Sequence, residues 1–503
     1  MAASPALGLA VSLLLVAGPA LAQTQAPKPA PRRTAVPAQP TAVPHTLAQA
    51  LAATYLYQPV LRAARAQLRA TDEDVPQALA GWKPTVIVAG TAGYGDGVTR
   101  QFLGSVGAFQ NLRTDRDIGT AQTTLTQPLY TGGKVRANVN RATDLVMAQR
   151  ANLMAQEETS FANAVNAYVG VISAQQTLAL NINNENVLRE QLQATNDQFR
   201  VGEVTRTDVA QAEASLATAI AQVQTAQGTL QTERATYTQF IGYEPPPDLA
   251  EPQPLRLPAR TEQQAVIMAA ANNPAVIAAQ FNDAAAKNQI EAAFAALLPQ
   301  VSFQGQLFQS NNASIRLDQA NGYTALLSVS VPLYQGGAEY SAVRQARQTE
   351  QQESQLIGDA QRTAVQNTIN GWETLIAARA AADSTRTAIR ANEIALVGVE
   401  REHLVGTRTT LDVLNAQQAL LSSQVTLVNN LAQLVTASYA LAQAVGRLTA
   451  RDLDLPVPFY DETAYFNQVK NKWAGIGVPR DETLYSPPPP PSPVLTTSPG
   501  NRP

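Results

Sequence analysis

The chain has 503 residues, of which 36 are Lys or Arg and 39 are Asp or Glu, and its formal net charge is −3. Only 15% of the residues are charged and 45% are hydrophobic, which argues against a polytopic inner-membrane protein and against a basic nucleic-acid-binding surface. The chain has no Cys, and His45 and His403 are its only His residues. The chain therefore lacks the Cys and most of the His side chains from which metal sites and nucleophile–base pairs are usually built. We expect no enzyme activity, no cofactor and no metal site.

The N-terminus has the pattern of a secretory signal peptide. Residues 7–21 are almost all small or apolar, and Ala20-Leu21-Ala22 fits a small-x-small cleavage site. No Lys or Arg precedes the apolar run, so a retained anchor helix is the alternative. Pro-rich stretches follow this segment and also close the chain, and neither composition can build a core.

Internal repetition is the strongest signal in the sequence. The block PLYTGG at 128–133 recurs as PLYQGG at 332–337, and VGEVT at 201–205 recurs as VGTRT at 405–409, both 204 residues later. In chain order we expect a signal peptide (1–22), a Pro-rich linker (23–45), a first repeat (46–242), a Pro-rich inter-repeat linker (243–261), a second repeat (262–446), a C-terminal extension (447–475) and a Pro-rich disordered tail (476–503).

Each repeat contains two short runs that alternate between apolar and polar residues. The predicted strands are about 85–94 and 119–127 in the first repeat, and 301–309 and 325–331 in the second. The polar segments between them are predicted to be loops. A run of about ten residues can cross a membrane as a tilted strand, but the smallest membrane barrels have about eight strands. Four strands per chain would therefore require oligomerisation in a membrane; the alternative is a soluble β-hairpin domain on a helical stalk.

Very long helices are predicted after each Gly-Gly block. Residues 133–199 and 337–403 contain no Pro and would extend about 100 Å if continuously helical. Apolar residues recur every seven positions in the helices that follow, which is typical of coiled coils. These positions are Val209, Leu216, Val223, Leu230 and Tyr237, and their repeat mates Val413, Leu420, Leu427, Leu434 and Leu441. Adjacent stripes favour a closed helical wall, although an ordinary helical bundle would also fit.

Two kinds of Gly-containing turn connect these elements. We interpret the doubled Gly blocks as strand-to-helix corners, because no Lys-Ser/Thr pair follows as in a phosphate loop. Val-Gly pairs break each long helix into a turn. The corner residues are Pro128, Gly132, Gly133, Pro332, Gly336 and Gly337.

The paired blocks and the helix–strand–strand–helix order resemble the TolC family of outer-membrane efflux and secretion ducts. The resemblance implies a mainly α fold with a small membrane β-barrel contribution. Three chains would form one α/β-barrel duct, with a shared 12-stranded barrel in the outer membrane of a Gram-negative bacterium and a helical barrel in the periplasm. It also implies partners: a periplasmic adaptor and an inner-membrane transporter of the RND, ABC or MFS type. The alternative is a periplasmic structural coiled-coil protein without a pore.

The family also implies roles for residues at the Val-Gly turns. The turns would meet the adaptor through Val201, Gly202, Thr205, Val405, Gly406 and Thr409. Asp208 and Arg408 match positions that hold the mouth closed, and Asp412 matches a luminal ring of acids. Asn415 stands where other members place a second acid, so we expect weaker blockade by cations.

These turn residues also have simpler explanations. Asp208 and Asp412 both lie at a helix start, where the helix dipole alone favours a carboxylate. His403 lies beside the second turn and could act as a pH-sensitive group, or simply pack at the surface.

Overall fold

The structure is a computed structural model, and it describes residues 43–103, 105, 107–256, 259–314 and 317–478. The predicted signal peptide, most of the 23–45 linker and nearly all of the 476–503 tail lie outside these residues. None of the helices within the described ranges is both long enough and apolar enough to cross a membrane.

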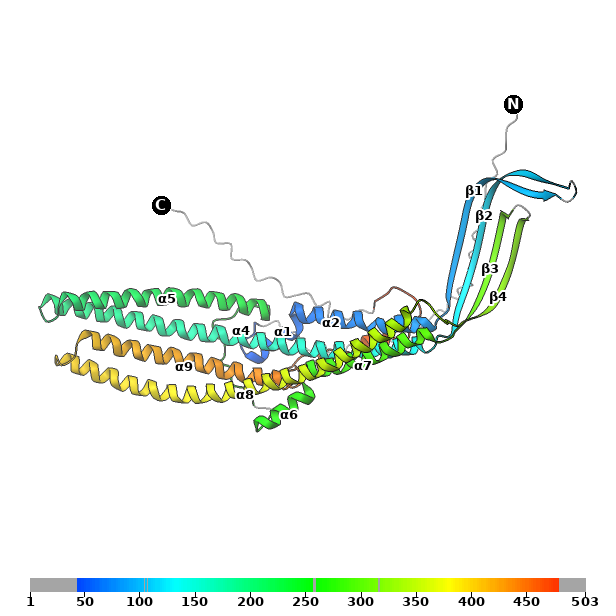
Figure 1. The fold of residues 1–503 in the computed structure, drawn as a ribbon. Helices are drawn as coiled ribbons and strands as arrows, with labels where there is room; N and C mark the ends of the chain where they lie inside the picture. The colour runs from blue at the N-terminus through cyan, green and yellow to red at the C-terminus, as the bar shows by residue number, and fades with distance from the viewer. Residues whose placement is uncertain (1–42, 104, 106, 257–258, 315–316, 479–503) are drawn as a thin grey trace, which may run out of the picture. The chain divides into compact units, whose positions relative to one another are not determined.

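The described chain is mainly helical and repeats one order of elements (Figure 1). The first repeat consists of α1 (Leu47–Tyr57), α2 (Pro59–Asp72), α3 (Asp74–Leu79), the 3-10 turn η1 (Ala80–Trp82), β1 (Thr85–Leu103), β2 (Ala108–Tyr130), α4 (Lys134–Arg200) and α5 (Arg206–Ile241). The second consists of α6 (Glu262–Asn272), α7 (Pro274–Phe294), η2 (Ala295–Leu297), β3 (Gln300–Ser314), β4 (Leu317–Ser330), α8 (Ala338–Leu404) and α9 (Thr410–Ala444), and α10 (Ala464–Val469) follows it. This order confirms the predicted tandem repeat.

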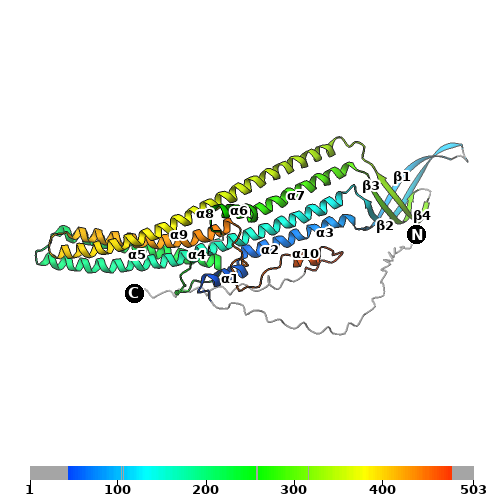
Figure 2. The same ribbon diagram turned by 90° about the horizontal axis from the view of Figure 1, so that it is seen from below.

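The two longest helices, α4 and α8, each contain 67 residues. In the half of the helical part that lies away from the strands, α5, α4, α9 and α8 lie side by side in that order (Figure 1). Towards the strands, α2, α4, α7 and α8 are neighbours instead (Figure 2). Val413 and Leu441 of the predicted heptad stripe are buried, and the three Leu residues between them are partly buried. The helices therefore form a layer in which each helix has a neighbour on either side, except at the margins.

Burial differs sharply between α4 and α8 although they are repeat mates. α4 has 22 buried residues and α8 has seven. The reason is position, because α4 packs between other helices along its whole length whereas α8 is the marginal helix of the layer. Among the residues that the structure describes, one side of α8 thus has no packing partner.

The main core lies at mid-length of the long helices. Its largest fully buried side chains are Tyr168, Tyr237 and Phe161. The Tyr168 hydroxyl donates to the backbone oxygens of His45 and Ala250, at 3.0 and 2.8 Å. These bonds fasten the start of the described chain and the inter-repeat linker to α4, so segments distant in sequence meet at mid-length of this helix.

The four strands form one antiparallel sheet in the order β1-β2-β3-β4, with β1 and β4 at the edges. Directly paired residues share a face, so the register defines two faces. One face is apolar and carries Val86, Val88, Leu125, Phe303, Leu307, Tyr323 and Leu327. The other is mostly polar and carries Thr85, Thr124, Thr126, Gln304, Gln306 and Thr324, with the apolar Ile87, Phe308 and Leu326 among them. The predicted alternation therefore corresponds to a real difference between the two faces.

The strands are longer than the sequence predicted. We expected 85–94 and 119–127, with a loop between them, but β1 and β2 continue as a paired hairpin across most of that interval. The Arg113 guanidinium pairs with the Asp96 carboxylate at 2.8 Å, and the Phe102 and Phe109 rings pack edge to face at 5.2 Å. Cross-strand side-chain pairs stabilise this extension without an apolar face, which is why alternation did not reveal it. β3 and β4 likewise extend into the predicted 310–322 loop.

The Gly-Gly blocks lie between strand and helix, with all four Gly residues at positive φ. Gly133 and Gly337 are the N-cap residues of α4 and α8. A Cβ on Gly132 would lie 2.8 Å from the backbone oxygen of Ala295, so this position also requires Gly for space. Pro128 lies inside β2 at an irregularity of the β2–β3 register, whereas Pro332 follows the end of β4. The corners thus share their Gly geometry but differ at Pro.

Candidate functional site: the two helical turns

Each long hairpin of helices reverses direction in five residues, at 201–205 and 405–409. In the first turn, Gly202 has φ +85°, its amide donates to the Phe199 oxygen at 3.0 Å, and the Glu203 amide donates to the Gln198 oxygen at 2.9 Å. The second turn repeats this pattern around Gly406, with φ +78°. Such a bond pair is a Schellman motif, which ends a helix with Gly in the left-handed conformation.

A capping box starts the returning helix in both turns. The Thr205 amide and hydroxyl donate to Asp208 Oδ2 at 2.8 and 2.7 Å, and the Asp208 amide donates to Thr205 Oγ1 at 3.3 Å. Thr409 and Asp412 make the same three bonds at 3.0, 2.9 and 3.3 Å. These bonds lower the pKa of both carboxyl groups, so both are ionised near neutral pH. The capping role accounts for both acids by itself.

The second turn contains an ion pair that the first lacks among its described side chains. Arg408 Nε donates to Glu402 Oε2 at 2.9 Å, across the turn. His403 Nδ1 lies 3.0 Å from the backbone oxygen of Arg408. Sequence reasoning identified Arg408 and His403 but missed Glu402; its only signal was an acid three residues before the Val-Gly pair.

The two turns lie at the same end of the helices, away from the strands (Figure 1). Asn415 is exposed one helical turn beyond Asp412, beside a groove of about 240 Å³ between α4, α5 and α9. Asn184 and Gln417 also line this groove. The residues predicted for the gate and for adaptor docking are therefore gathered at one end of the helical layer, whereas the predicted corner residues lie at the other end, next to the strands.

Apolar side chains project from the turns. Val201, Leu404 and Val405 are 71%, 80% and 74% exposed. Leu404 was missed by sequence reasoning, because it ends α8 outside the repeated VG block. The turns therefore expose large apolar side chains to water at the ends of two helices.

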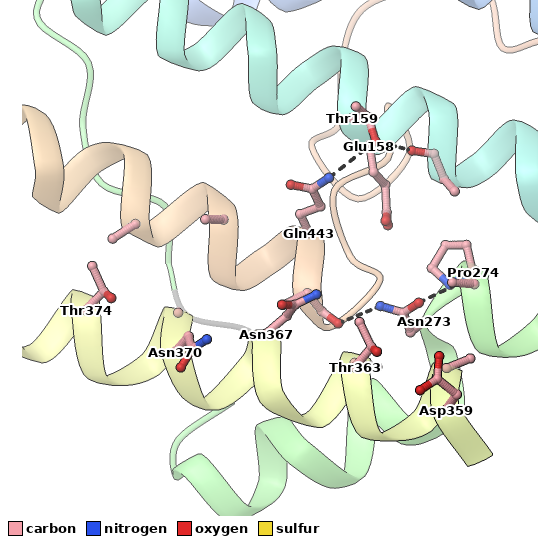
Figure 3. A pocket seen from close by; sticks show the side chains of 18 residues that line it. Glu158, Thr159, Asn273, Pro274, Asp359, Thr363, Asn367, Asn370, Thr374 and Gln443 are labelled. Carbon is pink, nitrogen blue, oxygen red and sulfur yellow. Dashed lines mark hydrogen bonds between the residues drawn. The ribbon is translucent and has the colours of Figure 1, made fainter. Parts of the chain in front are cut away.

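A second polar feature lies at mid-length of the helices (Figure 3). A groove of about 670 Å³ runs between α4, α8, α9 and the start of α7. Gln443 Nε2 donates to Thr159 Oγ1 at 3.5 Å across it, and Asn273 Nδ2 donates to the Ala444 oxygen at 3.0 Å (Figure 3). Glu158 also lines it, and burial raises its pKa to about 8.

Hydrogen-bonding groups line the groove. Apart from Glu158 and Asp359, the polar side chains labelled in Figure 3 are amides and hydroxyls. In the part of the chain that the structure describes, no three His, Asp or Glu side chains are grouped closely enough to hold a metal ion. The turns are thus the better candidate for a functional site.

Comparison with known proteins shows which family has this sequence and fold. A family model described as "Outer membrane efflux protein" matches residues 53–243 and 266–447. The chain is 36% identical over 444 residues to the outer membrane efflux protein BepC of Brucella suis, covering 87% of this chain and 93% of BepC. It is 26% identical over 358 residues to the outer membrane protein TolC of Escherichia coli, covering 66% and 70% of the two chains.

A solved structure gives the same result for the fold. The outer membrane protein VceC of Vibrio cholerae superposes with a TM-score of 0.67 at 21% identity, over 80% of this chain and 96% of VceC. The two ranges matched by the family model correspond to the two repeats of the sequence. The chain therefore belongs to the outer membrane efflux protein family, whose members are outer membrane channels that extend into the periplasm.

Proposed function

We propose that the chain is a passive duct that catalyses no reaction and that its two helical turns form the end that docks with an adaptor. It serves as an exit duct for efflux or type I secretion, as a homotrimer with a periplasmic adaptor and an inner-membrane transporter. The observation that carries the proposal is the sheet: one chain supplies four strands and leaves β1 and β4 as edges. Unpaired edges cost several kcal/mol per backbone group in lipid, so neighbouring copies must pair with them.

Two further observations support docking at the turns. Both turns end helices of equal length, and both expose apolar side chains. An adaptor with an apolar helical surface would cover Val201, Leu404 and Val405. Site-specific crosslinking from Leu404 in intact cells tests this, and we expect the crosslinked partner to be a periplasmic adaptor rather than the transporter.

The gate is a separate proposal. We assign Asp412 to a ring of three carboxylates, one from each copy, at the mouth of the duct, with Arg408 and Asp208 helping to hold that mouth closed. The support is that Asp412 is ionised, partly exposed and next to the turn. Asn415 supplies no second ring, so the duct should be blocked less strongly by multivalent cations than members with two acid rings.

Planar-bilayer conductance with a trivalent cation tests the ring. Asp412→Asn keeps an acceptor for the Thr409 amide but removes the charge, so the cation concentration for half-blockade should rise several-fold. The control is Asp383→Asn, an exposed carboxylate on α8 that is paired with Arg386, and it should leave blockade unchanged. Unchanged blockade in Asp412→Asn would refute the ring without affecting the duct itself.

A further inference from the structure

The C-terminal extension follows a defined path along α2. The Tyr460 amide donates to the Tyr55 hydroxyl at 2.9 Å, and the Tyr465 hydroxyl donates to Glu73 Oε1 at 2.7 Å. The Arg65 guanidinium lies over the rings of Tyr55 and Tyr460, at 4.4 and 5.2 Å from their centroids. These contacts fix the extension on the helices that lead to β1, and α10 packs against α2 (Figure 2).

The extension then reaches the base of β1. Lys83 Nζ donates to the backbone oxygen of Lys472 at 2.9 Å and lies 5.1 Å from the centroid of the Trp473 ring. Lys83 precedes β1 by two residues. Gln127 Nε2 donates to the Trp82 oxygen at 2.9 Å, which ties the same point to β2. Trp473 is therefore held at the junction of the helices with the sheet.

This junction exposes an unusual set of side chains. Trp473 is 73% exposed, Ile476 is fully exposed, and Trp82 and Val478 are exposed as well. The ammonium groups of Lys83 and Lys472 accompany them. Both Lys residues are partly buried, and Lys472 Nζ donates to the backbone oxygen of Gly477. Indole rings and Lys side chains beside an apolar surface are typical of the membrane–water interface, where the ring is partly desolvated and the ammonium remains in contact with headgroups.

The apolar face of the sheet begins immediately beyond the junction. Val86 and Val88 are exposed on that face, and Leu307 and Leu327 continue it on β3 and β4. The junction is thus continuous with the surface that faces lipid if β1 spans the outer membrane. Its positive charge also matches the phosphates that border such a surface.

We propose that Trp473, Trp82, Lys83 and Lys472 form a binding patch for phospholipid headgroups on the periplasmic side of the outer membrane. The two ammonium groups bind the phosphates, the indoles lie at the headgroup level, and Ile476 and Val478 enter the acyl region. The C-terminal extension is then a membrane anchor that links α2 to the bilayer. This inference rests on the proposed function, which places the strands in that membrane.

Quenching of Trp fluorescence by brominated phospholipid tests the patch. The chain has three Trp residues, at positions 82, 372 and 473. The full-length channel is reconstituted in vesicles of phosphatidylethanolamine and phosphatidylglycerol brominated near the headgroup end of the acyl chains. We expect the variant retaining only Trp473 to lose as much emission as the variant retaining only Trp82. The variant retaining only Trp372, on α8 about 50 Å of helix away from the strands, should lose none.

The outcomes separate the anchor from the duct. Quenching of Trp82 without quenching of Trp473 overturns the anchor and leaves the duct in place; contact of Trp473 with a neighbouring copy would give this result. No quenching at either position overturns both. Because the double substitutions could impair folding, the single substitution Trp473→Phe provides a second measurement. It should remove a component of the emission that bromolipid quenches, whereas the control Trp372→Phe should retain that component. If Trp473→Phe also retains it, the anchor is overturned.

Discussion

Glu158 is a carboxyl group with almost no contact with water. It is 2% exposed, and its Oε1 accepts a hydrogen bond from the Leu448 amide at 3.4 Å. Burial, with smaller contributions from the acids Asp452 and Glu157, raises its pKa to about 8 from an ordinary 4.5, although the Leu448 hydrogen bond lowers it. The group is therefore protonated in the folded chain at neutral pH and ionised in the unfolded chain.

This difference in protonation makes the free energy of unfolding depend on pH. The folded state binds the Glu158 proton more tightly, so the free energy of unfolding falls as pH rises from about 4.5 to about 8. Glu158→Gln cannot ionise and should remove this slope, so the variant should gain melting temperature over the native chain as pH rises. Thermal melting of the full-length oligomer between pH 5 and pH 9 measures the effect.

A matched control is Glu213→Gln on the exposed surface of α5, which should keep the native slope. If Glu158→Gln retains the native pH slope, burial of Glu158 is not what sets it.

At the residue scale, the sequence predicted positions better than contacts. Asp208 and Asp412 were expected at helix starts, and each is the third residue of its helix and part of a capping box. Glu158 was not identified, because nothing near it in sequence distinguishes a buried acid from the many solvated ones. Its environment depends on Leu448, 290 residues away.

The turns are elements whose stability depends on a few capping bonds. Thr409 supplies the N-cap of α9, with its hydroxyl both accepting from and donating to Asp412. Thr409→Ala removes these bonds and should cost about 1 kcal/mol locally. Hydrogen exchange at the amides of the first turn of α9 should accelerate about fivefold as a result.

Thr409→Ser retains the hydroxyl and should exchange close to the native rate, because Ser is an equally good N-cap residue. Equal protection in the Ala and Ser variants would mean that the Schellman motif around Gly406 fixes the turn without the capping box.

The long helices were predicted nearly to their ends, since α4 and α8 cover the two Pro-free spans. The lengths of the strands were not predicted, because apolar and polar residues do not alternate in the outer part of the β1–β2 hairpin. Its pairs, such as Arg113 with Asp96, are visible only once the register is known.

For the whole molecule, the two faces of the sheet should respond oppositely to charge. Leu327 lies on the apolar face and Leu326, its neighbour on β4, on the polar face. A Lys in the lipid-facing midplane of a membrane sheet costs about 2–4 kcal/mol, and a lumen-facing Lys costs little. Leu327→Lys should therefore reduce the heat-resistant oligomer recovered from outer membranes, whereas Leu326→Lys should not.

Equal recovery of the two variants would contradict the assignment of the faces. Loss of the oligomer in Leu326→Lys alone would reverse that assignment. The two substitutions change the same residue type at adjacent positions, so differences in expression or strand propensity largely cancel.

The repeat and the need for more than one copy were both readable from the sequence, and membership of the outer membrane efflux protein family agrees with them. The C-terminal extension was not. Its contacts are cation–π pairs, one of them with Arg65 of α2, and single hydrogen bonds to Tyr55, Glu73 and Lys83, the last of which is 389 residues from Lys472. The residues that make such contacts do not recur at a regular spacing, so no sequence pattern predicts them.

The equality of α4 and α8, at 67 residues each, constrains how this protein can change during evolution. Both helices start at a Gly-Gly corner and end at a Val-Gly turn, and the heptad stripes beside them fix their rotation. Shortening one helix alone would leave its turn short of the other, and removing fewer than seven residues would rotate the stripe away from its neighbours. Lineages can therefore alter the span of the periplasm that the channel covers only by paired changes in both halves of the gene, in steps of about 10 Å.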